Sequence, residues 1–510
     1  MTNRPIHRRF GWPIGWIGLW LLMTFCAQAE WHEITLGERE LIGREPVIGL
    51  VLSGVDAGRI ELRHSGDQWA SAHRMRRVDD RWKINFRDMG LEPGYHEFKL
   101  LIDHQWEDGM NRPLYIRRDG RATYPPAVYL TWKSDPTTTM TIHWHSDDEL
   151  DPSSLLYRTH GRSLWKNGHG ARVPFPHTSR WVHSVELTGL TPNQTYEFRF
   201  IDGEEVYRFK TLPKRLDPSL RFVSGGDVYH EIHWMNAMNR MVGARDPAFV
   251  VLGGGLAYAG GEPHNAYRWH ALLASFYDHL RAPDGRMIPI IAAVGYPEVQ
   301  GHTLLERPDF ESSRRWREAA APYFLNLFAF PGHPGYGVLD FGEYLSLILL
   351  DSMHLNPVDG AQATWLREVL QARKQIPHVF PFYHMPAYPS VHPFDALISA
   401  AIREHWVPLF EASPVRLAFE HHDPALKITH PLRGGERAVD GITYVGDGLW
   451  GTYTAAPATP EERPYLRTSA AVPHVFEVQL EPASRVVRAI GRNGEVLGSF
   501  SQPVLPKVSE

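Results

Sequence analysis

Side chains that bind metals or move protons gather in six short turns of the segment 220–455. The turns span Gly225–Asp227, Gly253–Tyr258, Gly295–Glu298, Tyr383–Pro389, Phe419–Pro424 and Gly446–Gly451. Among their residues are Asp227, Tyr258, His384 and His422, whose side chains can bind a metal or take part in proton transfer. The turns are therefore the expected location of this segment's chemistry.

The elements that must position these turns are strands alternating with helices. Apolar runs typical of buried strands lie at 221–224, 248–252, 288–294 and 345–350. Helical spacing occupies 231–242, 267–280 and 362–374. This alternation predicts a layered α/β domain. Because chemistry in such domains lies at the carboxyl ends of the strands, the turns should meet at one edge.

The order and spacing of the turns resemble the purple acid phosphatases, a family of calcineurin-like phosphoesterases. That family carries a strand-end Asp, a Gly-Asp-x-x-Tyr turn, a Gly-Asn-His-Asp/Glu turn, a lone His and a His-x-His pair. The resemblance covers roughly 120–455 and includes Leu350-Asp351-Ser352 and the run 360–366. It implies a four-layer α/β fold and two metals, commonly iron with zinc, manganese or iron, held about 3.5–4 Å apart by a bridging carboxylate.

The resemblance also assigns the ligand positions. Asp227 and Tyr258 match ligands of one metal, and His384 and His422 match ligands of the other. Four positions depart from the family pattern: Gly255 replaces the bridging Asp, Tyr296 the Asn, Pro297 the His that assists the leaving group, and Pro424 the last His.

These departures predict a degenerate site. Gly cannot bridge two cations, and Pro offers no side-chain donor. Losing a residue that merely orients a metal ligand costs about 10–100-fold in affinity or activity, so losing the ligands themselves should cost more. We therefore expect no two-metal phosphoester hydrolysis, and no catalytic residue is assigned because the family's catalytic His position is Pro297.

A remodelled site is the competing hypothesis. One weakly held divalent or trivalent metal (Fe, Zn or Mn) would be bound by Asp227, His384, His422 and a further histidine. The nearby candidates are His230, His233, His302, His354 and His421. Against this hypothesis, 28 His in the chain make chance placement near a loop common. The absence of any metal is the third alternative.

Residues 30–120 predict a small β-sandwich. Alternating runs at 60–63, 82–86 and 95–102 are separated by Gly, Asp and Pro. The segment resembles early-set, immunoglobulin-like glycogen-binding modules, in which two Trp on one face stack on sugars. Trp69 and Trp106 occupy those positions, so they are candidate glycan contacts. The alternative is a structural spacer in which these Trp residues pack internally or at an interface.

Residues 121–213 predict a second β-sandwich, resembling the fibronectin type III-like N-terminal domain of purple acid phosphatases. Trp144 is expected in its core, and the Tyr196 hydroxyl is expected to bond the backbone of the preceding Leu-x-Pro turn. The expected organisation is therefore multidomain: a signal peptide at 1–29, an early-set module at 30–120, a fibronectin III-like domain at 121–213, a metallophosphoesterase-like domain at 214–455 and a β extension at 456–510.

The N-terminus has the pattern of a cleavable export signal. Arg4, Arg8 and Arg9 precede an apolar run, and Ala27-Gln28-Ala29 supplies small residues for cleavage. Export predicts a secreted or periplasmic protein, and cleavage would remove Cys26, the single cysteine. The apolar run is too short and too interrupted to span a bilayer well. Cleavage would remove three of the 53 Lys and Arg and none of the 58 Asp and Glu, so the mature chain would have a formal net charge of 50 − 58 = −8, which argues against a general nucleic-acid binder.

Three functions follow from the sequence. The leading hypothesis is a secreted pseudo-phosphatase that binds a phosphorylated small molecule or a glycan. The second is an active phosphoesterase with a single-metal site. The third is a structural envelope protein in which both β-sandwiches are spacers.

Overall fold

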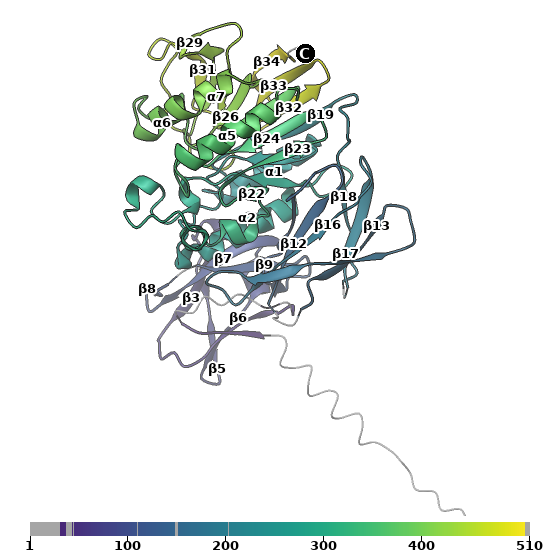
Figure 1. The fold of residues 1–510 in the computed structure, drawn as a ribbon. Coiled ribbons are helices and arrows are strands. Elements are labelled where there is room, and N and C mark those ends of the chain that lie inside the picture. The colour runs from purple at the N-terminus through teal and green to yellow at the C-terminus, as the bar shows by residue number, and fades with distance from the viewer. Residues whose placement is uncertain are drawn as a thin grey trace, which may run out of the picture. The chain divides into compact units, whose positions relative to one another are not determined.

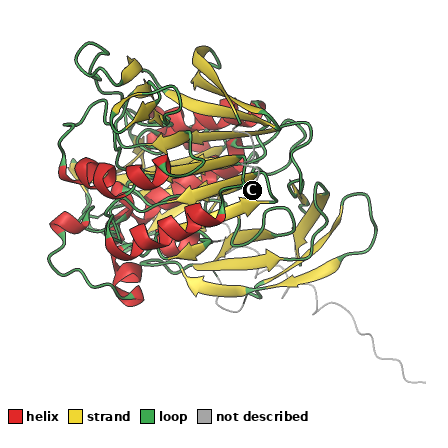
Figure 2. Cartoon of the chain, turned by 45° about the horizontal axis from the view of Figure 1, so that its top comes forward, coloured by secondary structure: helices red, strands yellow, loops and turns green. Residues whose placement is uncertain are grey.

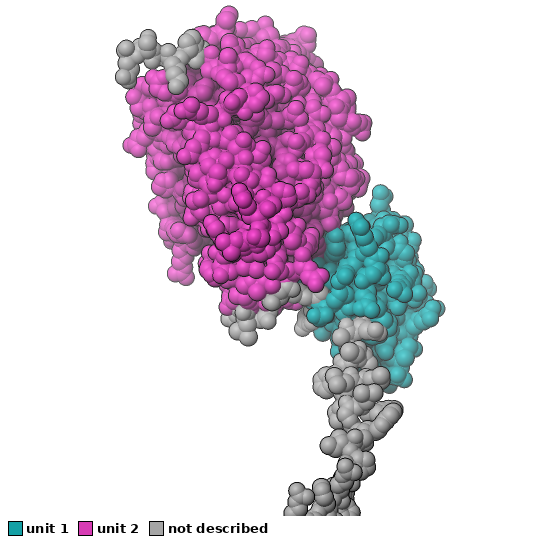
Figure 3. Space-filling model, turned by 90° about the vertical axis from the view of Figure 1, so that its right-hand side faces the viewer, with its two compact units in different colours: residues 1–124 teal, residues 125–510 magenta. Residues whose placement is uncertain are grey.

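The computed structural model contains two compact units, unit 1 at residues 1–124 and unit 2 at residues 125–510 (Figure 3). The residues whose structure is described are 31–36, 43, 45–109, 111–147, 151–201 and 203–504. The predicted signal peptide lies outside them. Within the described residues, no helix has the length and apolar character needed to cross a membrane.

Unit 1 is built from two β-sheets. The first has the order β1-β2-β6-β5, with β1 Trp31–Ile34, β2 Gly49–Leu52, β6 Arg81–Asn85 and β5 Arg76–Val78. The second has the order β10-β9-β7-β3-β4, with β10 Ala122–Thr123, β9 Arg112–Ile116, β7 Gly94–Ile102, β3 Ile60–His64 and β4 His73–Arg74, while β8 Gln105–Trp106 pairs with β7. Both sheets contribute to one core, which contains Leu50, Leu62 and Trp82. The predicted strands of this segment are confirmed.

A second β-sandwich begins unit 2. Its sheets have the orders β11-β12-β16-β15 and β14-β13-β17-β18. The strands are β11 Val128–Thr131, β12 Met140–Ser146, β13 Ser154–Thr159, β14 Lys166–His169, β15 Ala171–Pro174, β16 Trp181–Leu187, β17 Thr195–Phe200 and β18 Tyr207–Lys210. Trp144 is buried, and the Tyr196 hydroxyl accepts a bond from the Thr191 backbone N–H at 2.9 Å. Both contacts are those expected from the sequence.

The rest of unit 2 contains two larger sheets (Figure 1). One has the order β21-β20-β19-β32-β33-β34, with β19 Leu220–Gly225, β20 Val250–Leu252, β21 Ile290–Ala292, β32 His474–Glu481, β33 Ser484–Gly491 and β34 Val496–Pro503. The other has the order β22-β23-β24-β25-β26-β30-β27-β31, with β22 Gly332–His333, β23 Tyr336–Phe341, β24 Leu345–Leu349, β25 His378–Tyr383, β26 Leu417–Glu420, β30 Thr443–Gly446, β27 Leu426–Thr429 and β31 Leu466–Ala470. A small hairpin joins β28 Leu432–Arg433 to β29 Glu436–Arg437.

An aromatic core joins these two sheets. Phe222 on β19 lies 6.3 Å from Phe382 on β25 and 6.2 Å from Phe419 on β26, measured between ring centroids. Because side chains alternate along a strand, Val379 and Tyr383 of β25 face the opposite way and join a separate core with helices. The helices lie alongside these sheets (Figure 2).

The helices of unit 2 include the three expected from periodicity. Those are α1 Ile232–Ala244, α2 Ala266–His279 and α5 Gly360–Ala372. The others are α3 Arg314–Ala320, α4 Phe324–Leu327, α6 Leu397–His405 and α7 Val407–Glu411. Residues of α5, α6 and α7 share the core that contains Val379, so these helices cover one face of the eight-stranded sheet.

Candidate functional site

The six turns meet where the parallel strands end. Strands β19, β20 and β21 pair in parallel, as do β24, β25, β26 and β30, so their carboxyl ends share an edge of each sheet. Backbone bonds then join the turns: Asp227 N–H donates to Gly254 O at 3.1 Å, and Gly226 N–H donates to Gly448 O at 2.7 Å. This convergence is the one that the strand order predicted.

Asp227 and Tyr258 lie together, but they bond to each other. The Tyr258 hydroxyl donates to Asp227 Oδ1 at 2.7 Å, and both residues are held at positive φ. Burial raises the pKa of the Asp227 carboxyl, and the neighbouring Asp447 carboxyl raises it further. Burial likewise raises the pKa of Tyr258. The positions that match two ligands of one metal are therefore occupied by a neutral phenol, Tyr258, and by a carboxyl group whose ionisation is unfavourable, Asp227.

His384 and His422 form a second pair, with ring centroids 5.0 Å apart. His384 Nδ1 lies 3.0 Å from the Gly253 carbonyl, which can only accept, so Nδ1 carries the proton. The remaining Nε2 is buried and has no hydrogen-bond partner among the described residues. Burial lowers the pKa of His384, and lowers that of His422 to about 4. Both rings are neutral near pH 7 and can offer a lone pair.

The turn Gly253–Gly255 separates the two pairs. A Cβ atom at Gly255, where φ is +68°, would overlap Asp227 Oδ1. A Cβ at Gly254 would lie 2.7 Å from His384 Nδ1, on the other side of the turn. The space that a bridging carboxylate would need is therefore filled from both sides.

The other three replaced positions are built into the surrounding structure. The Tyr296 ring stacks on His302 at 4.2 Å and lies 5.5 Å from His422. The Pro297 carbonyl accepts a bond from Gly260 N–H at 2.7 Å, and the Pro424 carbonyl accepts one from Ala455 N–H at 2.8 Å.

The geometry does not fit a pair of metals. Among the described residues, the only three His, Cys, Asp or Glu side chains whose ligand atoms lie within 4.8 Å of one another are His64, Asp67 and His73, in unit 1. The turns of unit 2 instead supply two separate pairs, Asp227 with Tyr258 and His384 with His422. No chemical step through a metal pair is derived from this arrangement.

The five additional histidines have different environments. Both ring nitrogens of His354 already have hydrogen-bond partners: Nδ1 lies 2.8 Å from His302 O, and Nε2 lies 3.1 Å from Ser352 Oγ. His230 and His233 are exposed. His421 is buried against the glycine turn, and its Nε2 has no hydrogen-bond partner in the described part of the chain.

Two residues of the site were not predicted from the sequence. Asp447 is buried, its Oδ1 lies 3.5 Å from His421 Nδ1, and its carboxyl group raises the pKa of the neighbouring Asp227. His392 stacks on His422 at 4.6 Å and bonds Asp423 Oδ1 through Nδ1 at 2.5 Å, and this bond raises the pKa of His392. A Gly-Asp-Gly turn was the only sequence signal for Asp447, and His392 had none.

Known proteins resemble this chain in part of its sequence and in its fold. Residues 125–211 match the family model described as the N-terminal domain of purple acid phosphatase. The structure is also similar to purple acid phosphatase PPD1 from yellow lupin (Lupinus luteus) seeds, with 14% identity and a TM-score of 0.61 over 82% of this chain and 81% of that chain. Residues 125–211 are thus similar to the N-terminal domain of purple acid phosphatases, and the fold is similar to that of a purple acid phosphatase. This finding confirms the resemblance predicted from the order of the turns.

A further solved structure supports the same fold. The chain is also similar to PhoD, with 14% identity and a TM-score of 0.57 over 75% of this chain and 91% of that chain. A search of curated proteins found no match. The two structural similarities concern the fold, so the activity must be argued from the side chains.

Proposed function

We propose that this chain is a secreted pseudo-phosphatase, a metallophosphoesterase-family protein whose dinuclear site is degenerate and whose role is binding. The observation that carries the proposal is the 2.7 Å hydrogen bond from Tyr258 to Asp227. Two residues that match metal ligands satisfy each other, and a Cβ atom at Gly255 has no room beside them. A two-metal centre needs a bridging group that holds the cations about 3.5–4 Å apart, and this turn supplies none.

Metal analysis and a phosphatase assay test the proposal. Purified chain should contain no iron, zinc or manganese that His384→Ala removes, and it should not hydrolyse p-nitrophenyl phosphate. The variant Gly255→Asp/Tyr296→Asn/Pro297→His/Pro424→His should gain metal once both the side chain and the backbone of Asp227 move away from position 255, because a Cβ atom there contacts both. Adding His384→Ala to that variant is the matched control and should remove the gained metal.

Stoichiometric metal in the unmodified chain, with turnover that disappears in His384→Ala, would overturn the proposal. That outcome would establish the second candidate, a phosphoesterase with one metal. The observation that favours this candidate is the buried His384 Nε2, which has no partner among the described residues and belongs to a neutral ring.

The proposed ligand is a phosphorylated small molecule or a glycan. Trp69 and Trp106 support the glycan, because their rings lie 6.3 Å apart and Trp106 is 48% exposed. Their planes meet at 82°, so one sugar ring would stack on one indole while the other indole borders it.

A pull-down on insoluble polysaccharides tests the glycan. Trp106→Ala should lose retention, whereas Tyr453→Ala, at an exposed aromatic residue of unit 2, should keep it. Equal retention of all three forms would remove the glycan. Retention of neither a polysaccharide nor a phosphorylated compound would favour a structural envelope protein.

Export is tested by N-terminal sequencing of the secreted protein. Its first residue should be Glu30 if the signal is cleaved as proposed.

A further inference from the structure

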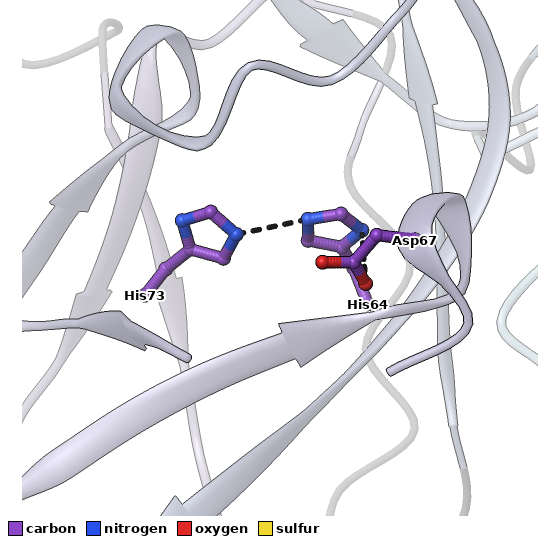
Figure 4. Close-up of side chains that lie close together, drawn as sticks. All are labelled: His64, Asp67 and His73. Atoms are coloured by element: carbon purple, nitrogen blue, oxygen red, sulfur yellow. Dashed lines mark hydrogen bonds and ion pairs between the residues drawn. The ribbon is translucent and has the colours of Figure 1, made fainter. Parts of the chain in front are cut away.

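We propose that His64, Asp67 and His73 bind one divalent transition-metal cation in unit 1, a site distinct from the turns of unit 2. One ligand atom from each side chain lies within 4.8 Å of the other two (Figure 4). Two imidazoles and a carboxylate are a ligand set that zinc commonly takes, with water completing the tetrahedron.

The fold brings the three residues together through one hairpin. Strands β3 and β4 pair with Leu62 opposite His73, and His64 lies two residues beyond Leu62 on the same face. The turn after β3 then carries Asp67 back over the hairpin, where its Oδ2 accepts a bond from Ser71 N–H at 2.8 Å. The carboxylate is thereby fixed beside the imidazole of His64.

The distance between the two imidazoles suits a shared cation. His64 Nε2 and His73 Nε2 lie 3.0 Å apart and share a proton (Figure 4). Two nitrogens about 2.0–2.1 Å from a tetrahedral zinc ion lie roughly 3.3–3.4 Å apart. A cation therefore replaces the shared proton after a small outward shift of the rings.

The third ligand has an oxygen available. Asp67 Oδ1 is buried and has no hydrogen-bond partner among the described residues. It lies 3.7 Å from His64 Nδ1, so the carboxylate must shift toward Nε2 to share the cation with the two rings. An ionised carboxylate and neutral imidazole rings are the forms that bind a metal.

One contact opposes binding. Gly66 N–H donates to His64 Nδ1 at 3.1 Å, which leaves the ring proton on Nε2. A cation on Nε2 moves that proton to Nδ1, so Gly66 loses its acceptor and the turn 65–67 must adjust.

Titration of the full chain without a histidine tag tests the site. Cobalt(II) is followed by its visible absorption, and zinc by calorimetry. Unmodified protein should bind one equivalent in unit 1, and His73→Ala should weaken binding at least about tenfold. Asp67→Asn, which keeps the shape of the side chain, should also weaken it. His104→Ala, at an exposed histidine of the same unit, is the matched control and should bind as the unmodified chain does.

His384→Ala distinguishes metal bound in unit 2 from metal bound in unit 1. This variant should still bind one equivalent of metal in unit 1. Absence of binding in the unmodified chain overturns the proposal. So does an affinity unaffected by His73→Ala and Asp67→Asn, or an equivalent lost only in His384→Ala. Circular dichroism of the metal-free variants shows whether they fold. If His73→Ala unfolds unit 1, the metal affinity of Asp67→Asn is the measurement that supports or overturns the proposal.

Discussion

Replacing Gly255 by Ala should destabilise unit 2, because the lost bridging position is now filled by the fold. The added Cβ would overlap Asp227 Oδ1 and would lie 2.9 Å from Asp227 Cα and 3.0 Å from its backbone nitrogen. Rotation of the Asp227 side chain relieves the first contact, but the backbone contacts remain. The positive φ of +68° adds strain for a residue with a side chain.

The expected loss is about 2–5 kcal/mol of unfolding free energy. Left-handed backbone costs a non-glycine residue about 1–2 kcal/mol, and overpacking a filled site costs about 1–3 kcal/mol. Gly260→Ala is the matched control, because its φ is +60° while the nearest atom to its Cβ is 3.7 Å away. That variant should lose only the backbone contribution.

Urea unfolding followed by circular dichroism measures both variants. If Gly255→Ala loses no more stability than Gly260→Ala, the turn can accommodate a side chain at position 255. The claim that the fold fills the bridging position would then be wrong. Adding Asp227→Ala to Gly255→Ala should recover only part of the loss, since it removes the carboxyl contact and leaves the backbone contacts.

Two further predictions concern stability. Lys427→Met should cost about 3–5 kcal/mol in urea unfolding, because it leaves the buried Glu420 carboxylate without the ammonium group 2.6 Å away; an equal loss in the control Lys133→Met, at an exposed position, would contradict this. Stability should also fall as pH drops below 6.5, since burial lowers to about 3 the pKa of His143, His354 and His378. Below pH 6.5 these histidines bind protons in the unfolded chain but stay neutral in the folded chain. The free energy of unfolding therefore falls by up to about 1.4 kcal/mol per pH unit for each histidine. Urea midpoints that do not change between pH 7 and pH 5 would refute it.

The sequence predicted the elements better than the site. Helices expected at 231–242, 267–280 and 362–374 lie within two residues of those observed, because each has an apolar face with helical spacing. Helices α6 and α7 were not predicted. They are short and adjoin at Trp406, and Pro408 interrupts the pattern.

The spacing of residues along the sequence could not predict the side-chain contacts of the two candidate sites. The contact of Asp447 with Asp227 depends on the meeting of turns more than 200 residues apart, so no local pattern contains it. The cluster of His64, Asp67 and His73 depends on the pairing of Leu62 with His73, and a change of register by one residue would turn His73 to the other face.

The pairing of β19 with β32 also has a consequence for the order of synthesis. Asp227 follows strand β19 by two residues, yet the antiparallel neighbour of β19 is β32, in which Leu480 lies opposite Leu220. Strand β32 is made about 250 residues later. Until that segment has been made, one edge of β19 is an open row of backbone donors and acceptors, which favours aggregation. A ribosome-bound or truncated chain ending before β32 therefore cannot complete this sheet. Chaperones or export factors that hold the nascent chain should act most strongly in that interval.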